Sequence, residues 1–268
     1  MTFKNLEPFG EIAQVVSTRI EGMSVEPYAT LNLGFHTGDD PDKVLLNREL
    51  LCQRLNIPLD CIVCAEQVHG AKVAVVEKQD WGRGSEDYGS AIKDSDAMIT
   101  AAEEIFLMVL LADCPGIVFY DPDKKAAGIA HAGWRPTLAG ISRNTVAEMK
   151  KAFGCRPENI LCGISPSIGP CCYEIGGDVF NKFSEQGFGL AGSDKPGPCC
   201  AEKRDGRLFL NLWEINRRQL IESGIKDGHI EVARLCSSCH TNLFYSVRKE
   251  GKTGRYAVLI GKRGRDPE

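Results

Sequence analysis

The sequence has few histidines and no long apolar segment. Its 268 residues include only five histidines, so any site built from imidazole must draw on a small set. No apolar run approaches the roughly 20 residues that a helix needs to cross a bilayer, which argues against a membrane-spanning protein. The net charge is only -4, and this near-neutral balance gives no sign of a protein that binds nucleic acid or a membrane surface.

Internal repeats, low-complexity segments and a secretory signal are also lacking. The first residues, MTFKNLEPFGEIAQVV, have neither a basic flank nor an unbroken apolar block. We therefore expect a cytoplasmic protein. The length is sufficient for one substantial hydrophobic core, and we predict a single domain over residues 1–268.

Cysteine, in contrast, is abundant, with twelve residues. In the reducing cytoplasm such a number points to free thiols, metal sites or catalysis and not to disulfides. The adjacent cysteines at 171–172 and at 199–200 are poor candidates for internal disulfides, because adjacency strains the geometry of the bridge.

The sequence contains two CxxC pairs, and each pair has the spacing of two of the four thiolate ligands of a zinc site. They are Cys61/Cys64 and Cys236/Cys239. The two pairs are distant in the sequence, so we expect ordinary reduced thiols at these positions. The second pair lies within CSSCH, which matches a haem-attachment spacing, but that attachment needs an exported chain.

Apolar periodicity predicts a mixture of strands and helices. Consecutive strands often lack a helix between them, which favours an α/β fold of α+β type over a doubly wound parallel sheet. We expect one layered domain of mixed, largely antiparallel sheets covered by helices, and a flexible excursion over residues 191–207. Strands are expected over 12–20, 61–77 (two strands), 105–114, 116–121, 125–132, 159–169, 229–240 and 254–264. Residues 27–41 are expected to form a strand that ends in a polar loop, and residues 87–100 a loop followed by a strand. Helices are expected over 39–56, from after 134 to about 153 and over 179–187, and a strand that runs into a helix is expected over 208–224.

A cysteine and a histidine flank a predicted hairpin. DPDK at 121–124 is a turn signal, and strands that pair about its centre place Cys114 directly opposite His131. Opposed residues point to the same face with Cβ atoms roughly 5 Å apart. Such a pair could hold a metal ion, act as a nucleophile and base, or be two ordinary buried residues. His69, which ends a strand before Gly70, is a third candidate whose proximity cannot be derived from spacing.

Seven motifs occur in one order along the chain. They are TRIEGMSVEPYATLNLGFHTGDDPDKVLLNRELL, EQVHG, SDAMIT, ADC, AHAGWRPTLAGI, SIGPCCYEIG and FYSVRKEGKTGRYAVLI. Together they resemble the laccase-domain polyphenol oxidoreductase family, whose members are also described as purine nucleoside phosphorylases. The resemblance covers about the whole chain. It implies a single-domain layered fold related to the catalytic domain of cytotoxic-necrotizing-factor toxins.

The resemblance also implies a zinc ion and its ligands. By motif, the ligands and catalytic residues are His69 of EQVHG, Cys114 of ADC and His131 of HAGW. Three protein ligands leave the fourth tetrahedral position open, as in catalytic zinc sites. The chain departs from the family pattern at Pro115, which follows the cysteine at once, and at Pro136, which replaces a glycine. Both departures are expected to reshape the rim of the pocket and so to affect substrate choice.

The activity that the resemblance implies is zinc-dependent phosphorolysis of purine nucleosides. Adenosine or inosine would react with inorganic phosphate to give the free base and ribose 1-phosphate, and deamination of adenosine is left open. Arg135, beside a predicted helix start, is the expected anion-binding residue. Arg19 and Asn32 are expected to line the substrate pocket. Asp113 alternates to the face opposite Cys114, so we expect it to orient the site without binding the metal.

Three other functions stay open at this point. One is a cysteine hydrolase for cell-wall precursor peptides, with Cys114 as nucleophile and His131 as base. Another is copper-dependent phenol oxidation, which ranks lower because blue-copper and multicopper centres need more histidines than this chain readily offers. The last is a thiol-rich metal-binding or redox module without catalysis. The preferred nucleoside and the oligomeric state are not determined by the sequence.

Overall fold

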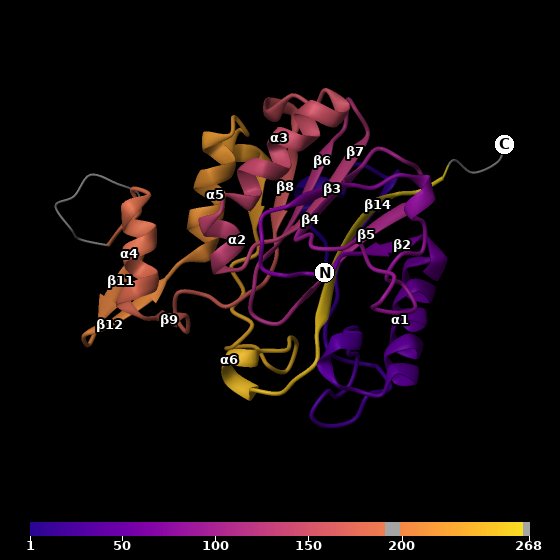
Figure 1. The fold of residues 1–268 in the computed structure, drawn as a ribbon, viewed down its shortest axis with the longest axis horizontal. Coiled ribbons are helices and arrows are strands. Elements are labelled where there is room, and N and C mark those ends of the chain that lie inside the picture. The colour runs from indigo at the N-terminus through magenta and orange to yellow at the C-terminus, as the bar shows by residue number, and fades with distance from the viewer. Residues whose placement is uncertain (191–198, 265–268) are drawn as a thin grey trace.

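The fold is built from layers (Figure 1). A computed structural model describes residues 1–190 and 199–264 of the chain. Two sheets pack face to face, with helix α1 (Pro41–Leu55) on the outer face of one and helices α3 (Ile141–Phe153) and α5 (Leu212–Glu222) on the outer face of the other. This arrangement confirms the predicted α/β fold of layered sheets covered by helices.

The first sheet has four strands in the order β1, β14, β5, β2. Strand β14 is antiparallel to β1 and β5, and β2 is parallel to β5. The strands are β1 (Ile12–Val16), β14 (Tyr256–Lys262), β5 (Ile105–Leu111) and β2 (Ile62–Cys64).

The second sheet has six strands in the order β13, β8, β6, β7, β4, β3. Its central pairs are antiparallel, as predicted, and only the two edge strands pair parallel with their neighbours. The strands are β13 (Ile230–Val232), β8 (Leu161–Ile164), β6 (Gly116–Asp121), β7 (Ala126–His131), β4 (Ala97–Thr100) and β3 (Val73–Val75).

A small third sheet lies at one side of the molecule, beside helix α4 (Figure 1). The predicted flexible excursion at 191–207 lies partly outside the described residues, and its described part, from Cys199 on, enters the β11–β12 hairpin. The elements are β9 (Glu174–Ile175), α4 (Gly177–Glu185), β10 (Gly189–Leu190), β11 (Cys199–Arg204) and β12 (Arg207–Leu210).

The main core lies between the two large sheets. Leu107 and Val109 of β5 belong to this central core, whereas Phe106 and Met108 belong to the cluster beneath α1. Because successive side chains of a strand point to opposite faces, a strand covered on both faces must be apolar throughout. The unbroken apolar sequence of β5 therefore follows from its place between two layers.

Helix α1 confirms the helix predicted over 39–56. Asp40 caps it, since the Asp40 side chain accepts a hydrogen bond from the backbone N–H of Asp42, and Pro41 takes the first helical position, where its missing N–H costs nothing. The helix ends where Asn56 adopts a left-handed conformation.

The single helix predicted from Trp134 to Phe153 is wrong. The segment forms α2 (Trp134–Leu138) and then α3, and the break falls at Gly140. Gly140 has φ 78°, a left-handed conformation that ends regular helix and that glycine adopts at low cost. Arg135 therefore lies in a short helical turn and not at the start of a long helix.

The strand predicted within 27–41 is also wrong, because this segment pairs with no sheet. The amide of Asn47, on α1, donates hydrogen bonds to Ser24, to the backbone oxygen of Thr30 and to that of Asn32. The apolar side chain of Leu31 is buried in the hydrophobic cluster beneath α1, so its burial does not require that this segment join a sheet.

The predicted hairpin exists, but its register differs. Asp121 pairs with Ala126, and His131 pairs with Gly116 instead of Cys114. The Asp121 carboxylate accepts two backbone hydrogen bonds inside the loop, which lengthens the turn to residues 122–125. Cys114 lies before β6 begins, so its position relative to His131 is set by the bend at 112–115 and not by strand pairing.

Within the described ranges, the structure contains no helix that is both long and apolar enough to traverse a lipid bilayer.

Candidate active site and metal centre

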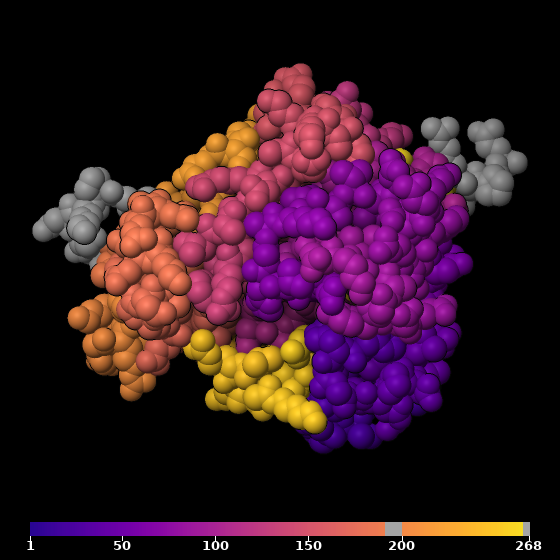
Figure 2. Space-filling model, viewed as in Figure 1, coloured from indigo at the N-terminus to yellow at the C-terminus, as the bar shows by residue number. Residues whose placement is uncertain are grey.

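A cavity of about 660 Å³ opens where the chain passes between the two large sheets. Residues 65–72 lead from β2 in the first sheet to β3 in the second, and residues 112–115 lead from β5 to β6. The short helix α6 (Val247–Glu250) forms another wall, and Figure 2 shows the surface hollowed between this yellow segment and the magenta middle of the chain. These crossing segments carry the site, as loops commonly do on a rigid scaffold.

The structure brings His69, Cys114 and His131 together in this cavity. One ligand atom from each lies within 4.8 Å of the others. The two imidazole rings have their centroids 4.7 Å apart and are nearly perpendicular, at 83°. His131 is buried, Cys114 is half-buried and His69 is exposed, so the group faces the open end of the cavity. Two imidazoles and one thiolate at this spacing are a suitable ligand set for zinc.

Asp96 is the residue that positions both histidines. Its Oδ1 lies 2.7 Å from Nδ1 of His131 and accepts the backbone N–H of His69 at 3.0 Å. Its Oδ2 accepts the N–H groups of Val68 and Gly70. His69 is held at φ 59°, a conformation uncommon outside glycine, and this carboxylate stabilises it. With Nδ1 engaged, His131 presents Nε2 to the site.

The charges in the site favour a thiolate. Burial by itself would raise the pKa of Cys114, but the positive charge and hydrogen bonds of His131, with those of His69, lower that pKa to about 6. Burial likewise opposes protonation of His131, yet the Cys114 thiolate and Asp96 raise the pKa of His131 to about 9. A deprotonated thiol is the form that binds metal or attacks a substrate.

Gly133, of the HAGW motif, leaves room for the group. A Cβ atom at this position would lie 2.8 Å from Sγ of Cys114 and 3.4 Å from Cδ2 of His69. The first distance is shorter than van der Waals contact allows, so any larger residue must displace the thiol.

The cavity is also lined by positively charged side chains. Arg48 and Arg255 line it, and their guanidinium groups donate hydrogen bonds to backbone carbonyl oxygens. No carboxylate of the described residues forms an ion pair with either. His36 lies beside them, and burial together with the charges of Arg255 and Arg48 lowers its pKa to about 4. This group of side chains is suited to an anion.

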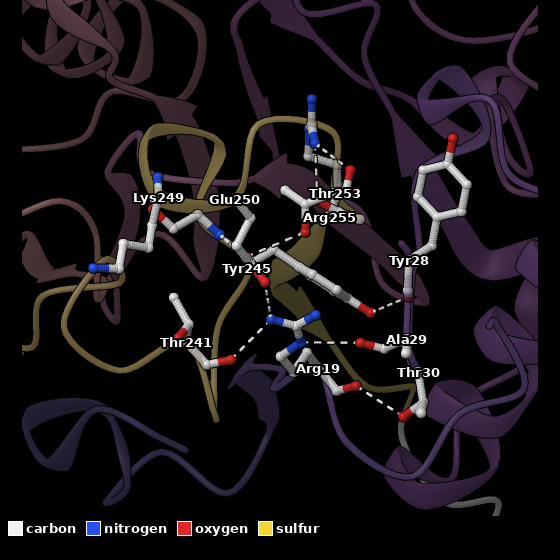
Figure 3. A network of polar contacts seen from close by, with 12 residues as sticks. Arg19, Tyr28, Ala29, Thr30, Thr241, Tyr245, Lys249, Glu250, Thr253 and Arg255 are labelled. Atoms are coloured by element: carbon white, nitrogen blue, oxygen red, sulfur yellow. Dashed lines mark hydrogen bonds and ion pairs between the residues drawn. The ribbon is translucent and has the colours of Figure 1, made fainter. Parts of the chain in front are cut away.

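The residues that line the cavity do not include the three predicted substrate-binding residues, Arg135, Arg19 and Asn32. Arg135 is exposed and lies over the ring of Trp134, which itself lines the cavity. Arg19 donates hydrogen bonds to the backbone oxygens of Ala29 and Thr241 and forms a 2.6 Å ion pair with Glu250 (Figure 3). It lines a separate, smaller pocket.

Asn32 has a structural environment as well. It is fully buried, and its side-chain oxygen accepts the backbone N–H groups of Gly34 and Arg255. Its amide donates to Asp39 at 2.9 Å. Asn32 therefore reaches the cavity only through the backbone of Arg255, whose position it fixes.

Asp113 lies in the bend between β5 and β6, so strand alternation does not set its direction, and it lines the cavity together with Cys114. It lies outside the His69–Cys114–His131 group, and its carboxylate accepts Ser237 Oγ and the backbone N–H of Arg248, each at 2.7 Å. Its φ of 89° turns the chain immediately before Cys114.

Sequence reasoning missed several residues of the cavity. Asp96 stood inside SDAMIT and Arg255 inside KTGRY, but nothing local distinguishes them from solvated charges. Tyr173 followed the vicinal cysteines, and Arg48 lay on a predicted helix face. The only available signal was their presence in the motifs of the family resemblance.

The suggested four-thiolate combination of Cys61, Cys64, Cys236 and Cys239 does not form. Cys61 and Cys64 are buried in the cluster beneath α1. Cys236 and Cys239 instead lie next to Cys171 and Cys172. The pairing of two cysteine pairs was decided by which loops the strands bring side by side.

The fold and the site together define a member of a known enzyme family. The family model described as multi-copper polyphenol oxidoreductase laccase matches residues 13–263, and the chain belongs to this family.

Two relatives, one of which also has a solved structure, show the extent of the similarity. Purine nucleoside phosphorylase YlmD of Geobacillus stearothermophilus is 37% identical over 96% of this chain and 92% of its own length. Adenosine deaminase RL5, from an unknown prokaryotic organism, is 30% identical over 84% of this chain and 83% of its own. The crystal structure of YlmD from Geobacillus stearothermophilus superposes with a TM-score of 0.90 at 37% identity, covering 96% and 94% of the two chains.

Replacing Gly133 by alanine should weaken zinc binding at the His69–Cys114–His131 group without unfolding the protein. The added Cβ atom would meet Sγ of Cys114 at 2.8 Å, so the thiol must move off the common point of the three ligands. We expect zinc affinity to fall by at least about tenfold, measured by competition with a fluorescent chelator. Gly228→Ala is the matched control, since a Cβ there meets nothing within 4 Å. Unchanged affinity in Gly133→Ala would contradict this geometry.

Replacing Asp96 by asparagine should weaken zinc binding at the same site, because Asp96 positions both histidine ligands. The amide keeps the shape but has one acceptor oxygen for contacts that two oxygens now share. We expect zinc affinity to fall about 10- to 100-fold, with stability reduced by about 1–3 kcal/mol. Thermal unfolding with and without zinc separates the effects. A variant that loses stability equally in both conditions and binds zinc normally would show that Asp96 only holds the fold.

Proposed function

We propose that this protein is a zinc-dependent purine nucleoside phosphorylase. The observation that carries the proposal is that one cavity is lined both by a two-histidine, one-cysteine group and by two arginines that form no ion pair within the described residues. The names of the relatives point to the same class of reaction and to adenosine deamination. The volume of about 660 Å³ lies in the range of small-molecule sites.

The donor set fits zinc. His69, Cys114 and His131 would hold the ion through two ring nitrogens and one thiolate, which leaves one tetrahedral position for a ligand from the cavity. When bound, zinc would supply Lewis-acid polarisation of a substrate atom or a water of lowered pKa. Asp96 fixes the tautomer and orientation of His131, as carboxylates commonly do for metal-binding histidines.

The two arginines would bind the phosphate. The buried Arg48 donates hydrogen bonds to backbone carbonyl oxygens and to Sγ of Cys64, and the half-buried Arg255 donates to the carbonyl oxygens of Thr253 and Gly254. Neither forms an ion pair with a carboxylate of the described residues, so both charges would be better satisfied by a doubly charged anion. In phosphorolysis a phosphate oxygen forms a bond to the anomeric carbon while the bond from that carbon to the base nitrogen breaks. The base leaves with the bonding electron pair and takes up a proton.

The remaining walls suit a purine. Trp134, Tyr88 and Tyr173 contribute aromatic surface to the cavity. Flat rings stack favourably on such side chains and exclude water from the reacting bond. Whether the bound nucleoside is cleaved, deaminated or both depends on where phosphate and purine lie relative to the metal. We propose that the activity is cytoplasmic, because abundant cysteines in a reducing compartment are typical of free thiols and metal ligands.

Inosine cleavage should require both phosphate and zinc. We expect purified protein to release hypoxanthine only when phosphate is present, and His69→Ala to abolish release, as followed by chromatography. Arg255→Met should raise the phosphate KM about 10- to 100-fold, because a charged hydrogen bond contributes about 1.5–3 kcal/mol.

Arg143→Met, an exposed arginine paired with Glu222 on the far helices, is the matched control. Equal effects of the two arginine variants would refute the role of Arg255 in phosphate binding. Activity without phosphate that still depends on zinc would favour deamination or hydrolysis instead.

A cysteine hydrolase is the second candidate, because Asp96, His131 and Cys114 have the order of a nucleophilic triad. The convergence of His69 on the same point favours the metal, since a triad does not need it. Activity that survives thorough chelation and is lost on alkylation of Cys114 would favour the hydrolase. Copper with phenol oxidation would appear as copper content and a coloured protein.

A further inference from the structure

Four cysteines meet outside the cavity. The Sγ atoms of Cys171, Cys172, Cys236 and Cys239 all lie within 4.8 Å of one another. Sγ of Cys239 is 3.4 Å from Sγ of Cys172 and 3.6 Å from Sγ of Cys171. We infer that these four thiolates form a structural zinc site, separate from the group of His69 in the cavity.

The spacing agrees with a tetrahedral zinc ion. Four sulfurs at the usual Zn–S distance of about 2.3 Å are about 3.8 Å apart, close to the separations observed. The observed separations are too long for sulfur–sulfur bonds, which measure about 2.05 Å. A tetrahedron of four sulfurs closes the coordination sphere, which is typical of structural zinc.

Neighbouring strands bring the two cysteine pairs together. Strand β8 leads into the loop of Cys171 and Cys172, and β13, its parallel neighbour, leads into the loop of Cys236 and Cys239. The loops stay side by side: Ser167 donates its N–H to Leu235 O at 3.1 Å and accepts the N–H of Ser237 at 3.0 Å. The pairing therefore follows from strand order and not from sequence distance.

The backbone already supports a thiolate cluster. The N–H of Gly169 donates to Sγ of Cys236 at 3.2 Å, and the N–H of Cys239 donates to the carbonyl oxygen of Cys236 at 3.2 Å. The first bond stabilises negative charge on sulfur, and the second closes the turn of the CxxC pair. The donor set is sulfur alone, and soft thiolates select zinc over magnesium or calcium.

Zinc at this site would fasten a wall of the cavity. Ile168 and Tyr173, on the first loop, line the cavity. Ser237, between the two cysteines of the second loop, donates its hydroxyl to Asp113, the residue before Cys114. The cluster thus joins the two loops that support the site from behind, while contributing no atom to it.

The metal content of full-length protein tests this inference. We expect wild type purified with zinc to hold two zinc ions per chain by plasma mass spectrometry. The double variant Cys171→Ser/Cys239→Ser should hold one, His69→Ala should hold one, and their combination none. Cys171 and Cys239 are exposed, so serine there is a mild change, and circular dichroism checks the fold. Cys155→Ser, at a buried cysteine outside both groups, is the matched control and should hold two.

Cobalt and thiol measurements distinguish the two sites independently of activity. His69→Ala loaded with Co²⁺ should show intense thiolate-to-cobalt charge transfer from four sulfurs, and the double cysteine variant a much weaker band from one. All twelve thiols should titrate after denaturation with chelator. The inference is overturned if the double cysteine variant keeps two zinc ions or if His69→Ala holds no zinc. It is also overturned if two thiols are missing as a disulfide, or if the cluster contains iron. Loss of nucleoside cleavage in any variant does not enter this test.

Discussion

A single buried carboxylate organises the candidate active site. Asp96 accepts hydrogen bonds from three consecutive backbone N–H groups around His69 and from the ring of His131. Burial would raise its pKa, but these contacts together lower it, so the group is an anion in the fold. A buried anion is tolerable only when it is fully hydrogen-bonded. The requirement to satisfy Asp96 therefore also brings two potential metal ligands to one point.

The packing of two sheets explains where the site lies. Their facing surfaces need apolar side chains on every strand, and the chain can expose polar groups only where it leaves one sheet for the other. The segments after β2 and after β5 are such crossings, and they carry His69 and Cys114. His131 joins them because it ends β7, which is antiparallel to β6. The candidate metal ligands therefore lie where the chain crosses between the two large sheets.

Charge is distributed unevenly around the cavity. The His69–Cys114–His131 group suits a cation, while Arg48 and Arg255, which line the same cavity, form no ion pair with a carboxylate of residues 1–190 or 199–264. A cavity that contains both a metal-binding group and two guanidinium groups suits the pair of reactants proposed above, which comprises a neutral base and an anionic co-substrate. Zinc in the four-cysteine cluster, as inferred above, would instead hold two loops together, because four sulfur ligands would close its coordination sphere.

Local sequence predicted the elements whose signals are local. Helix α1 followed from its Asp-Pro start and apolar spacing, and β5 to β7 from their apolar runs. It failed at Gly140, where a left-handed residue splits a periodic segment, and at the 121–126 turn, where the Asp121 side chain sets the loop length. Both errors came from a conformation or contact that periodicity does not encode.

What the sequence by itself determined is the composition of the site: few histidines, many cysteines, and the motifs that hold His69, Cys114 and His131. Only the tertiary structure decided which groups meet. It joined Asp96 to two histidines and paired Cys236 and Cys239 with Cys171 and Cys172 in place of the Cys61 pair. The physical reason is that such contacts depend on the order of strands in a sheet, which is set by burial of the whole core and not by any short segment.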